Sequence, residues 1–473
     1  MDSSYISRQE LRHLQMRRRD DVGEVFEWRG KVLRAIYPES KALICYLFDC
    51  GLIEELVTKK LIPGTTISVY TIEGFAMVLE HEVITPIIYP QEWSFNMLKR
   101  ASQVILQVAE IALSYGINMK DCHSLNILFV GGLAKFVDIG SFQFTPDGCR
   151  GWLPYQEFIR CYYYPLTFWS IGLEHVAKLS IFSGNLTSHV EFLLFRYTLF
   201  RCLPPSLSRV VAKYSFVFSQ LCLISNEDIS KKVQNSILQK AVILAKRAAA
   251  FLERLFCATN FEKLKRMVGS QRPNEVVTLW SEYHQNIERK RARFTNLVDL
   301  INTHSSDART SIDLAGNQGH FSREVLRNTK IERAICQDND QWAIDKGFVE
   351  APTDLSLSFV HYDLMAPMIK MSHGVPCERL RADIAFALAV SHHIILSQKF
   401  SLEDFLYIVK SYAQKYVFIE FMPKGLWLYG AEVDVPDWYC VDWFQDGFGK
   451  YYELIHVEEI ASNNIVFIGR NDV

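Results

Sequence analysis

One stretch of the sequence constrains the fold more than any other, because an apolar segment passes through a turn of small residues directly into a helix-like pattern. The stretch reads Ser311-Ile-Asp-Leu-Ala-Gly-Asn-Gln-Gly-His-Phe-Ser322. Ile312 and Leu314 predict a short buried strand, and Gly316 and Gly319 allow a ligand to approach the backbone closely. A strand, a tight turn and a helix in this order are typical of sites that bind a phosphate or a nucleoside.

An acidic residue at the end of the next predicted strand narrows the ligand to a nucleoside. Asp338 follows the apolar residues of Ile331-Glu-Arg-Ala-Ile-Cys-Gln-Asp338. In dinucleotide sites, an acid about 20 residues beyond the glycines accepts hydrogen bonds from the ribose hydroxyls. The turn and the acid together therefore predict a nucleoside-containing ligand.

The turn itself departs from the dinucleotide pattern G-x-G-x-x-G, since the corresponding run is Ala315-Gly-Asn-Gln-Gly319. The order of Asp313, a small residue, Asn317 and Gly319 instead resembles the first motif of class I S-adenosylmethionine-dependent methyltransferases. This resemblance implies that Gly316, Asn317 and Gly319 form the cofactor-binding turn. It also implies that Asp313 helps to hold the turn and the methionine amino group.

The resemblance to class I methyltransferases continues beyond the first motif. It implies that Asp338 binds the ribose hydroxyls. Asp363, in Phe359-Val-His-Tyr-Asp363, falls where the third strand of that family ends beside adenine. The segment Ala382-Asp-Ile-Ala-Phe-Ala-Leu-Ala-Val-Ser-His-His393 is similar to its fourth strand and the following loop. The expected cofactor is therefore S-adenosylmethionine.

Three further segments resemble a narrower bacterial group, the methyltransferases related to nodulation protein NoeA and to enzymes of cell-surface polysaccharide clusters. They are Trp280-Ser-Glu-Tyr283, the His392-His393 pair and Ile419-Glu-Phe-Met-Pro-Lys424. This resemblance implies a saccharide or glycolipid acceptor. Ala315 departs from the family pattern, which usually has glycine there, and its methyl group would crowd the methionine end of the cofactor.

Methyl transfer from a sulfonium to a hydroxyl or amine needs alignment of the two reactants and a base. Histidine has an ordinary pKa of about 6.5, which suits proton acceptance near neutral pH. His392 or His393 is therefore the candidate base, and a structural role for the pair in the loop is equally open. Glu420 ends an apolar run and either lines the acceptor pocket or caps a helix.

A second informative region lies in the N-terminal half, where Gly131-Gly132 separates two apolar segments and predicts a β-hairpin. Asp121, Asn126 and Asp138 flank this hairpin with spacing that resembles the protein-kinase and aminoglycoside-phosphotransferase fold. In that fold the first acid orients the acceptor hydroxyl, and the other two residues hold magnesium on the nucleotide phosphates. The resemblance implies a site for ATP and magnesium.

The surroundings of this N-terminal motif depart from the kinase pattern. Met119 stands in place of the usual histidine, and no G-x-G-x-x-G loop precedes it. No phosphate-binding lysine stands out among the candidates Lys31, Lys41, Lys59 and Lys60. We therefore expect weak, magnesium-dependent ATP binding and at most slow phosphoryl transfer. The alternative is that the acids only cap turns.

Length and composition bound the remaining possibilities. A chain of 473 residues predicts two or three domains, and a net charge of −2 gives no global field that would attract nucleic acid. The 11 cysteines form no C-x-x-C pair, which favours reduced thiols in the cytoplasm. No segment reaches the roughly 18 apolar residues of a membrane span. The sequence gives no indication of an oligomeric state.

The pattern of predicted elements divides the chain into three parts. Residues 1–224 predict an α+β domain with a small lobe to about residue 90, which the resemblance implies is kinase-like, and residues 225–272 predict a helical connector. Residues 273–473 alternate strand and helix, which predicts a mainly parallel, Rossmann-like α/β sheet with helices on both faces.

The leading interpretation is a cytoplasmic methyltransferase that acts on a small acceptor. One rival is a sugar or small-molecule kinase with a degenerate methyltransferase domain. The other is a non-enzymatic nucleotide-binding scaffold.

Overall fold

The computed structural model describes most of the chain in separate stretches. These are residues 5–14, 20–147, 151–183, 261–273, 287–352, 355–366, 368–371, 373–425, 427–428, 431–432 and 434–471. The segment Trp280–Tyr283 and most of the expected helical connector lie outside these residues. The domain boundaries expected near residues 224 and 272 therefore stay predictions.

The N-terminal small lobe is built on a five-stranded antiparallel sheet in the order β2-β3-β4-β7-β5. Its central hairpin turns at Arg29-Gly30, where both residues have positive φ, as a two-residue type I′ turn requires. The elements of this lobe are β1 (Tyr5–Ile6), β2 (Arg12–His13), β3 (Gly23–Trp28), β4 (Lys31–Ile36), α1 (Lys41–Asp49), α2 (Leu52–Thr58), β5 (Thr65–Ile67), β6 (Thr71–Ile72) and β7 (Met77–His81).

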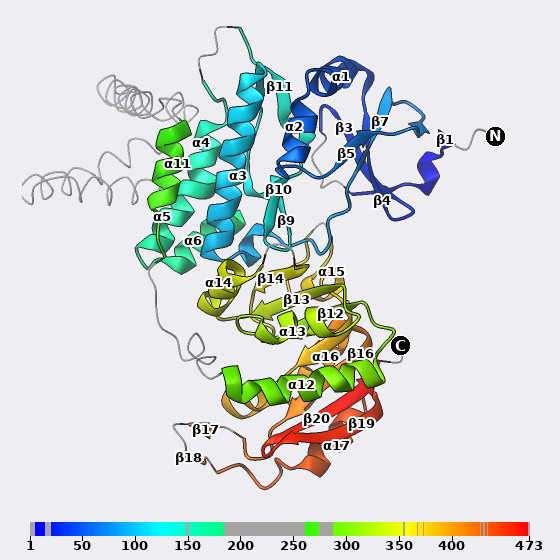
Figure 1. The fold of residues 1–473 in the computed structure, drawn as a ribbon, viewed down its shortest axis with the longest axis vertical. Coiled ribbons are helices and arrows are strands. Elements are labelled where there is room, and N and C mark those ends of the chain that lie inside the picture. Colours follow the sequence, from blue (N-terminus) through cyan, green and yellow to red (C-terminus); the bar gives the residue numbers. More distant parts are fainter. Residues whose placement is uncertain are drawn as a thin grey trace, which may run out of the picture.

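The helical lobe is organised around a long helix, α3 (Phe95–Ser114), which ends before Gly116 with its positive φ. Gly131-Gly132 form the loop of the expected hairpin, because Val130 pairs with Leu133. The other elements are β8 (Ile117–Met119), β9 (Ile127–Val130), β10 (Leu133–Phe136), β11 (Phe142–Phe144), α4 (Tyr155–Phe158), the π-helical turn Ile159–Tyr163, α5 (Tyr164–Ser170), α6 (Glu174–Ser183) and α11 (Phe261–Ser270). Helix α11 packs on α3 (Figure 1).

The C-terminal half forms a seven-stranded sheet in the order β14-β13-β12-β15-β16-β20-β19. The strands from β14 to β16 are parallel, and β20 and β19 add an antiparallel hairpin at one edge. The strands are β12 (Thr310–Leu314), β13 (Arg333–Asp338), β14 (Leu357–His361), β15 (Ala382–Ala387), β16 (Ala413–Phe421), β19 (Glu453–Ala461) and β20 (Asn464–Arg470). This arrangement confirms the expected mainly parallel α/β sheet.

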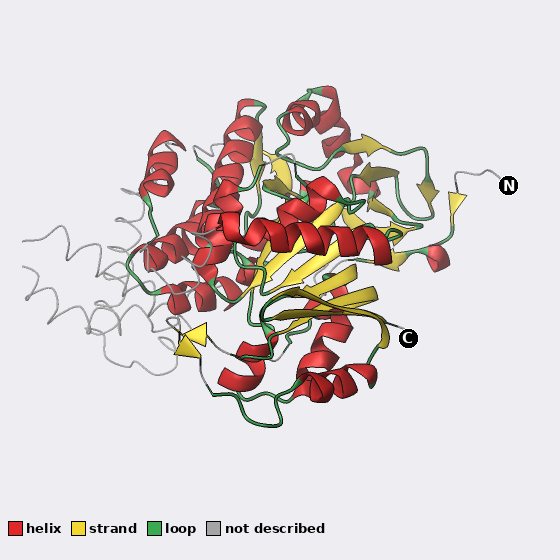
Figure 2. Ribbon diagram, turned by 60° about the horizontal axis from the view of Figure 1, so that its bottom comes forward, coloured by secondary structure: helices red, strands yellow, loops and turns green. Residues whose placement is uncertain are grey.

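Helices cover both faces of this sheet (Figure 2). Alternate strand residues point to opposite faces, so that Phe386 and Phe418 pack with α12 and α13, whereas Ala385 and Val417 join the core under α16 and α17. The remaining elements are α12 (Ile287–His304), α13 (His320–Asn328), α14 (Gln341–Glu350), α15 (Pro376–Arg379), the π-helical turn His393–Ser397, α16 (Leu402–Tyr412), β17 (Trp427–Leu428), β18 (Ala431–Glu432) and α17 (Val441–Gly449).

The order of the strands determines where a ligand can bind. From β12 the chain passes outward to β13 and β14 on one side, and β15 and β16 follow on the other side. The carboxyl ends of β12 and β15 therefore form the switch point at which doubly wound sheets bind ligands. Within the described stretches, no helix combines the length and apolar character needed to cross a lipid bilayer.

Candidate functional site

The turn after β12 adopts an unusual backbone conformation. Ala315, Asn317 and Gly319 have φ values of 60°, 53° and 71°. Glycine adopts this left-handed region freely and asparagine tolerates it, but for alanine it costs roughly 1–2 kcal/mol. Between them, Gly316 is required for space, because a Cβ there would lie 2.7 Å from Oδ2 of Asp313. The turn is therefore tightly wound over the Asp313 carboxyl group.

The Asp313 side chain is buried beneath this turn and does not line the pocket described below. One of its oxygens accepts a hydrogen bond from the hydroxyl of Ser322 in the first turn of α13, at 3.2 Å. Burial raises the pKa of Asp313 to about 7, and the nearby Asp338 carboxylate adds to the rise. Asp313 thus connects β12 to α13.

Asp338, the last residue of β13, presents a carboxylate that two backbone amides orient. Asn317 N donates to Oδ2 and Asp340 N donates to Oδ1, each at 2.8 Å. Burial raises the pKa of Asp338 to about 6, and these amide hydrogen bonds oppose the rise. A carboxylate oxygen can accept two hydrogen bonds, so each oxygen retains capacity for a ligand hydroxyl.

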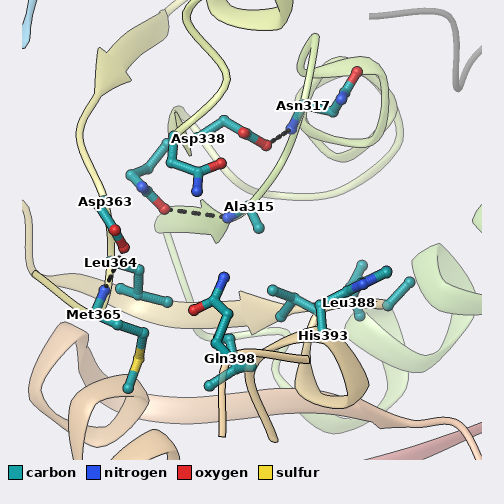
Figure 3. Close-up of a pocket in the computed structure, with 14 residues that line it drawn as sticks. Ala315, Asn317, Asp338, Asp363, Leu364, Met365, Leu388, His393 and Gln398 are labelled. Atoms are coloured by element: carbon teal, nitrogen blue, oxygen red, sulfur yellow. Dashed lines mark hydrogen bonds between the residues drawn. The ribbon is translucent and has the colours of Figure 1, made fainter. Parts of the chain in front are cut away.

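A pocket opens at the carboxyl ends of β12, β13, β14 and β15 (Figure 3). Asn317 and Asp338 lie on one side of it, Asp363 lies beside Leu364 and Met365, and His393 lies near Leu388. Asp363 Oδ1 accepts a hydrogen bond from Met365 N at 2.9 Å. The lining residues are Ala315, Asn317, Gln337, Asp338, Asn339, Asp363, Leu364, Met365, Leu388, Ala389, Val390, His393, Ile394 and Gln398.

Only some of the predicted cofactor-binding residues line the pocket. Of the six predicted cofactor-binding residues, Asn317, Asp338 and Asp363 line the pocket, whereas Asp313, Gly316 and Gly319 shape the turn behind it. The geometry therefore separates residues that can touch a ligand from residues that position them.

Gln337 is a pocket residue that sequence reasoning missed. Its Oε1 accepts a hydrogen bond from Ala315 N at 3.1 Å, and its Nε2 donates to the carbonyl of Tyr362 at 2.5 Å. The side chain thus ties the turn after β12 to the loop after β14. A buried glutamine next to Asp338 was the available signal, because such a group must find hydrogen-bond partners.

The two candidate histidines occupy different environments. His393 lines the pocket, whereas His392 is buried behind it. The centroids of the two imidazole rings are 4.0 Å apart. Burial lowers the pKa of His392 to about 3, and the neighbouring His393 contributes to this shift. Burial also lowers the pKa of His393. Only His393 stands where it could accept a proton from a bound acceptor.

Glu420 does not line the pocket. Its carboxylate is fully buried and forms a bidentate ion pair with Arg293 of α12, and Asn464 Nδ2 donates to it at 2.8 Å. The pairing satisfies the buried charge and joins α12 to the sheet.

The Ala315 methyl group gives a testable link between backbone strain and ligand binding. Ala315→Gly removes the methyl group that lines the pocket. It also removes the strain that the left-handed backbone conformation imposes on alanine at this position. We expect S-adenosylhomocysteine to bind about 1 kcal/mol more tightly, the lower end of the cost of an extra methyl group in a packed site. Calorimetric titration measures this change.

Lys60→Gly is the matched control for that substitution. Lys60 also has positive φ, at 57°, but it is exposed in the N-terminal half. It should leave the dissociation constant unchanged. Equal or weaker binding to Ala315→Gly would show that the methyl group does not crowd the ligand.

In the N-terminal half, the candidate residue Asp138 forms an ion pair with an arginine side chain that the sequence reasoning did not identify. Arg34 of β4 is buried, and its guanidinium pairs with Asp20 Oδ2 at 2.5 Å and with Asp138 Oδ1 at 3.0 Å. Gly140 makes room for it, because a Cβ there would lie 2.6 Å from Arg34 Nη1. Asp138 also caps the next turn by accepting from Gly140 N.

Asp121 and Asn126 pair with each other beside this cluster. Asn126 Nδ2 donates to Asp121 Oδ1 at 2.6 Å, and burial is the main cause of the raised pKa of Asp121. The described residues contain no group of three or more His, Cys, Asp or Glu side chains that could hold a metal ion. Arg34 already pairs with Asp138, so a magnesium ion there would have to displace the guanidinium, and these side chains as arranged do not fit a magnesium–nucleotide site.

Comparison with known proteins gives one curated relative over most of the chain. No family model matches. The chain is 26% identical over 431 residues to nodulation protein NoeA of Rhizobium meliloti (strain 1021), an alignment that covers 86% of this chain and 84% of that protein.

Solved structures of methyltransferases match about two fifths of the chain at lower identity. N-methyltransferase NodS from Bradyrhizobium japonicum WM9 is 10% identical, covers 40% of this chain and 99% of its own, and gives a TM-score of 0.29. Human N-acetylserotonin methyltransferase in complex with SAM is 9% identical, covers 41% of this chain and 55% of its own, and gives a TM-score of 0.30.

Proposed function

We propose that this protein is an S-adenosylmethionine-dependent methyltransferase that acts on a saccharide or glycolipid intermediate of cell-surface polysaccharide synthesis. The observation that carries the proposal is the convergence of Asn317, Asp338 and Asp363 on one pocket at the switch point of a doubly wound sheet. The acceptor class is supported by the resemblance of Trp280–Tyr283, His392-His393 and Ile419–Lys424 to the NoeA-related group.

The pocket residues fit an adenosine-containing cofactor. Asp338 has two oriented carboxylate oxygens that can accept hydrogen bonds from the ribose hydroxyls. Asp363 and Leu364 would lie beside the adenine, and the turn at Ala315 and Gly316 would lie under the methionine end. The bound cofactor would supply the electrophilic methyl group.

The chain's own residues would align the acceptor and take up its proton. His393 is the candidate base, because it lines the pocket and a lowered pKa keeps its ring neutral at pH 7. Leu388, Val390 and Ile394 provide apolar walls beside it that would limit the access of water.

Replacement of Asp338 tests the proposal. Asp338→Ala should weaken S-adenosylhomocysteine binding by about 1–3 kcal/mol, because the ribose hydroxyls would lose their acceptors in a largely buried site. Calorimetry measures the change, and Asp338→Asn provides a variant of nearly unchanged volume. Asp307→Ala is the matched control, since Asp307 is an exposed acid that pairs with Lys415 before β12 begins.

The pKa of Asp338 adds a pH dependence to this test. The ionised carboxylate accepts more hydrogen bonds than the neutral acid, so affinity should fall as the pH drops below about 6 in the wild type. Asp338→Asn should lack this dependence. Equal affinity of wild type and Asp338→Ala would contradict the assignment of the ribose site.

A further inference from the structure

The loops that form the cofactor side of the pocket also carry the junction between the two halves of the chain. Helix α14 begins at Gln341, shortly after Asp338, and packs against α3 of the N-terminal half (Figure 1). Phe348 of α14 meets Phe129 of β9 edge to face, with ring centroids 5.8 Å apart. One continuous apolar core includes both rings.

Two polar side chains on one face of α14 are bound by the N-terminal half. Gln341 is buried, and its amide accepts from Trp169 Nε1 and donates to Glu174, each at 2.9 Å. One turn later, the two carboxylate oxygens of Asp345 accept from Asn96 N and Asn96 Nδ2, each at 2.6 Å. Residues four positions apart share a helix face.

The Asp345 carboxylate depends on these partners because it is buried. Burial is the largest influence on its pKa, which is raised, and the hydrogen bonds from Asn96 oppose that rise. Removing a partner from a buried polar group costs more than the pair contributes when intact. The position of α14 is therefore sensitive to changes at Asn96.

The start of α14 is connected directly to the ribose-binding carboxylate. Asp340 caps the helix by accepting from Trp342 N and Ala343 N, while its own backbone N–H donates to Asp338 Oδ1. One of the two amides that orient Asp338 is thus that of Asp340, the N-cap residue of α14. The N-terminal half binds this same helix. A shift of α14 would move that amide.

The loop after β14 is held in a similar way. Arg379 of α15 forms a buried ion pair with Glu92 and donates to the carbonyl of Ile87. Tyr89 hydrogen-bonds the ring and the backbone N–H of His373 in the same loop. The N-terminal half therefore contacts the segments that follow both β13 and β14.

We infer that the N-terminal half positions the ribose-binding site of the C-terminal half, with Gln341 and Asp345 of α14 as positioning residues that act through Asp340 on Asp338. This inference rests on the proposed function. It gives the N-terminal half a role in cofactor binding that requires no phosphoryl transfer. Coupling through such packed contacts commonly amounts to a roughly 2- to 30-fold change in affinity.

The test uses the full chain and two substitutions on the same helix. Asn96→Ala removes the side-chain hydrogen bond to Asp345, whereas Glu110→Ala removes an ion pair between α3 and Lys265 of α11. We expect Asn96→Ala to raise the dissociation constant for S-adenosylhomocysteine by about 2- to 30-fold and Glu110→Ala to leave it unchanged. Thermal melts establish that both variants are folded at the titration temperature.

Hydrogen exchange in the ligand-free protein gives a second readout. Asn96→Ala should speed exchange of the amides in residues 338–345, and Glu110→Ala should not. Unchanged exchange there, or unchanged affinity despite a lowered melting temperature, would overturn the inference. A wild type that binds no S-adenosylhomocysteine would contradict the proposed function, and the exchange result would still decide whether the N-terminal half positions this segment.

Discussion

Replacing His393 with alanine is expected to lower turnover by roughly 10²- to 10⁴-fold while leaving S-adenosylhomocysteine affinity nearly unchanged. His393 lines the pocket, and its lowered pKa keeps it neutral and able to accept a proton at pH 7. The rate can be measured with tritium-labelled S-adenosylmethionine and an oligosaccharide mixture as acceptor. On the acid side, turnover should fall as the pH drops through the lowered pKa of His393.

His392→Ala is the matched control for the base assignment. His392 is buried behind the pocket, and with a pKa of about 3 it is a weak proton acceptor. Its replacement should lower the melting temperature and leave the pH profile of turnover unchanged. If His392→Ala abolishes turnover in a folded protein and His393→Ala does not, the assignment of the base is wrong.

Replacing Arg34 with methionine is expected to destabilise the protein by about 3 kcal/mol, because removing one partner of a buried ion pair leaves its carboxylates uncompensated. Asp20 and Asp138 would both lose the guanidinium, and Asp121 lies close enough to feel the charge of Asp138. Denaturant unfolding measures the loss. Arg34→Lys keeps the charge and should retain part of the stability.

The response of the melting temperature to magnesium distinguishes an Arg34 ion pair at Asp138 from a metal site there. The wild type should show no magnesium-dependent shift in its melting temperature, because Arg34 already supplies the positive charge at Asp138. In Arg34→Met, magnesium should stabilise the protein by compensating the unpaired Asp20 and Asp138 carboxylates. Stabilisation of the wild type by magnesium and ATP would instead support the nucleotide site that the spacing of Asp121, Asn126 and Asp138 predicts.

The sequence predicted the elements of the C-terminal half well, because local signals define them. Strand β12, the turn and α13 lie within a single stretch, and Asp338 ends β13 as its position after an apolar run predicts. The carboxyl ends of parallel strands meet at one edge, so Asp338 and Asp363 were expected to lie together. The hairpin at Gly131-Gly132 followed from equally local chemistry.

Features that depend on distant partners could not be predicted in this way. Arg34 and Asp138 are far apart in the sequence, and no local pattern indicates that a strand arginine will pair with a turn acid. The choice between His392 and His393 depends on a π-helical turn that begins at His393 and changes the direction of successive side chains. The left-handed conformation of Ala315 runs against the preference of its residue type.

The measurement that tests the central claim most directly is calorimetric titration of the wild-type chain with two ligands in parallel. We predict that S-adenosylhomocysteine binds with one site per chain, and that ATP with magnesium gives no binding heat. The assignment of the pocket at the carboxyl ends of β12 to β15 to a methyltransferase would be contradicted if S-adenosylhomocysteine does not bind, whether or not ATP with magnesium does.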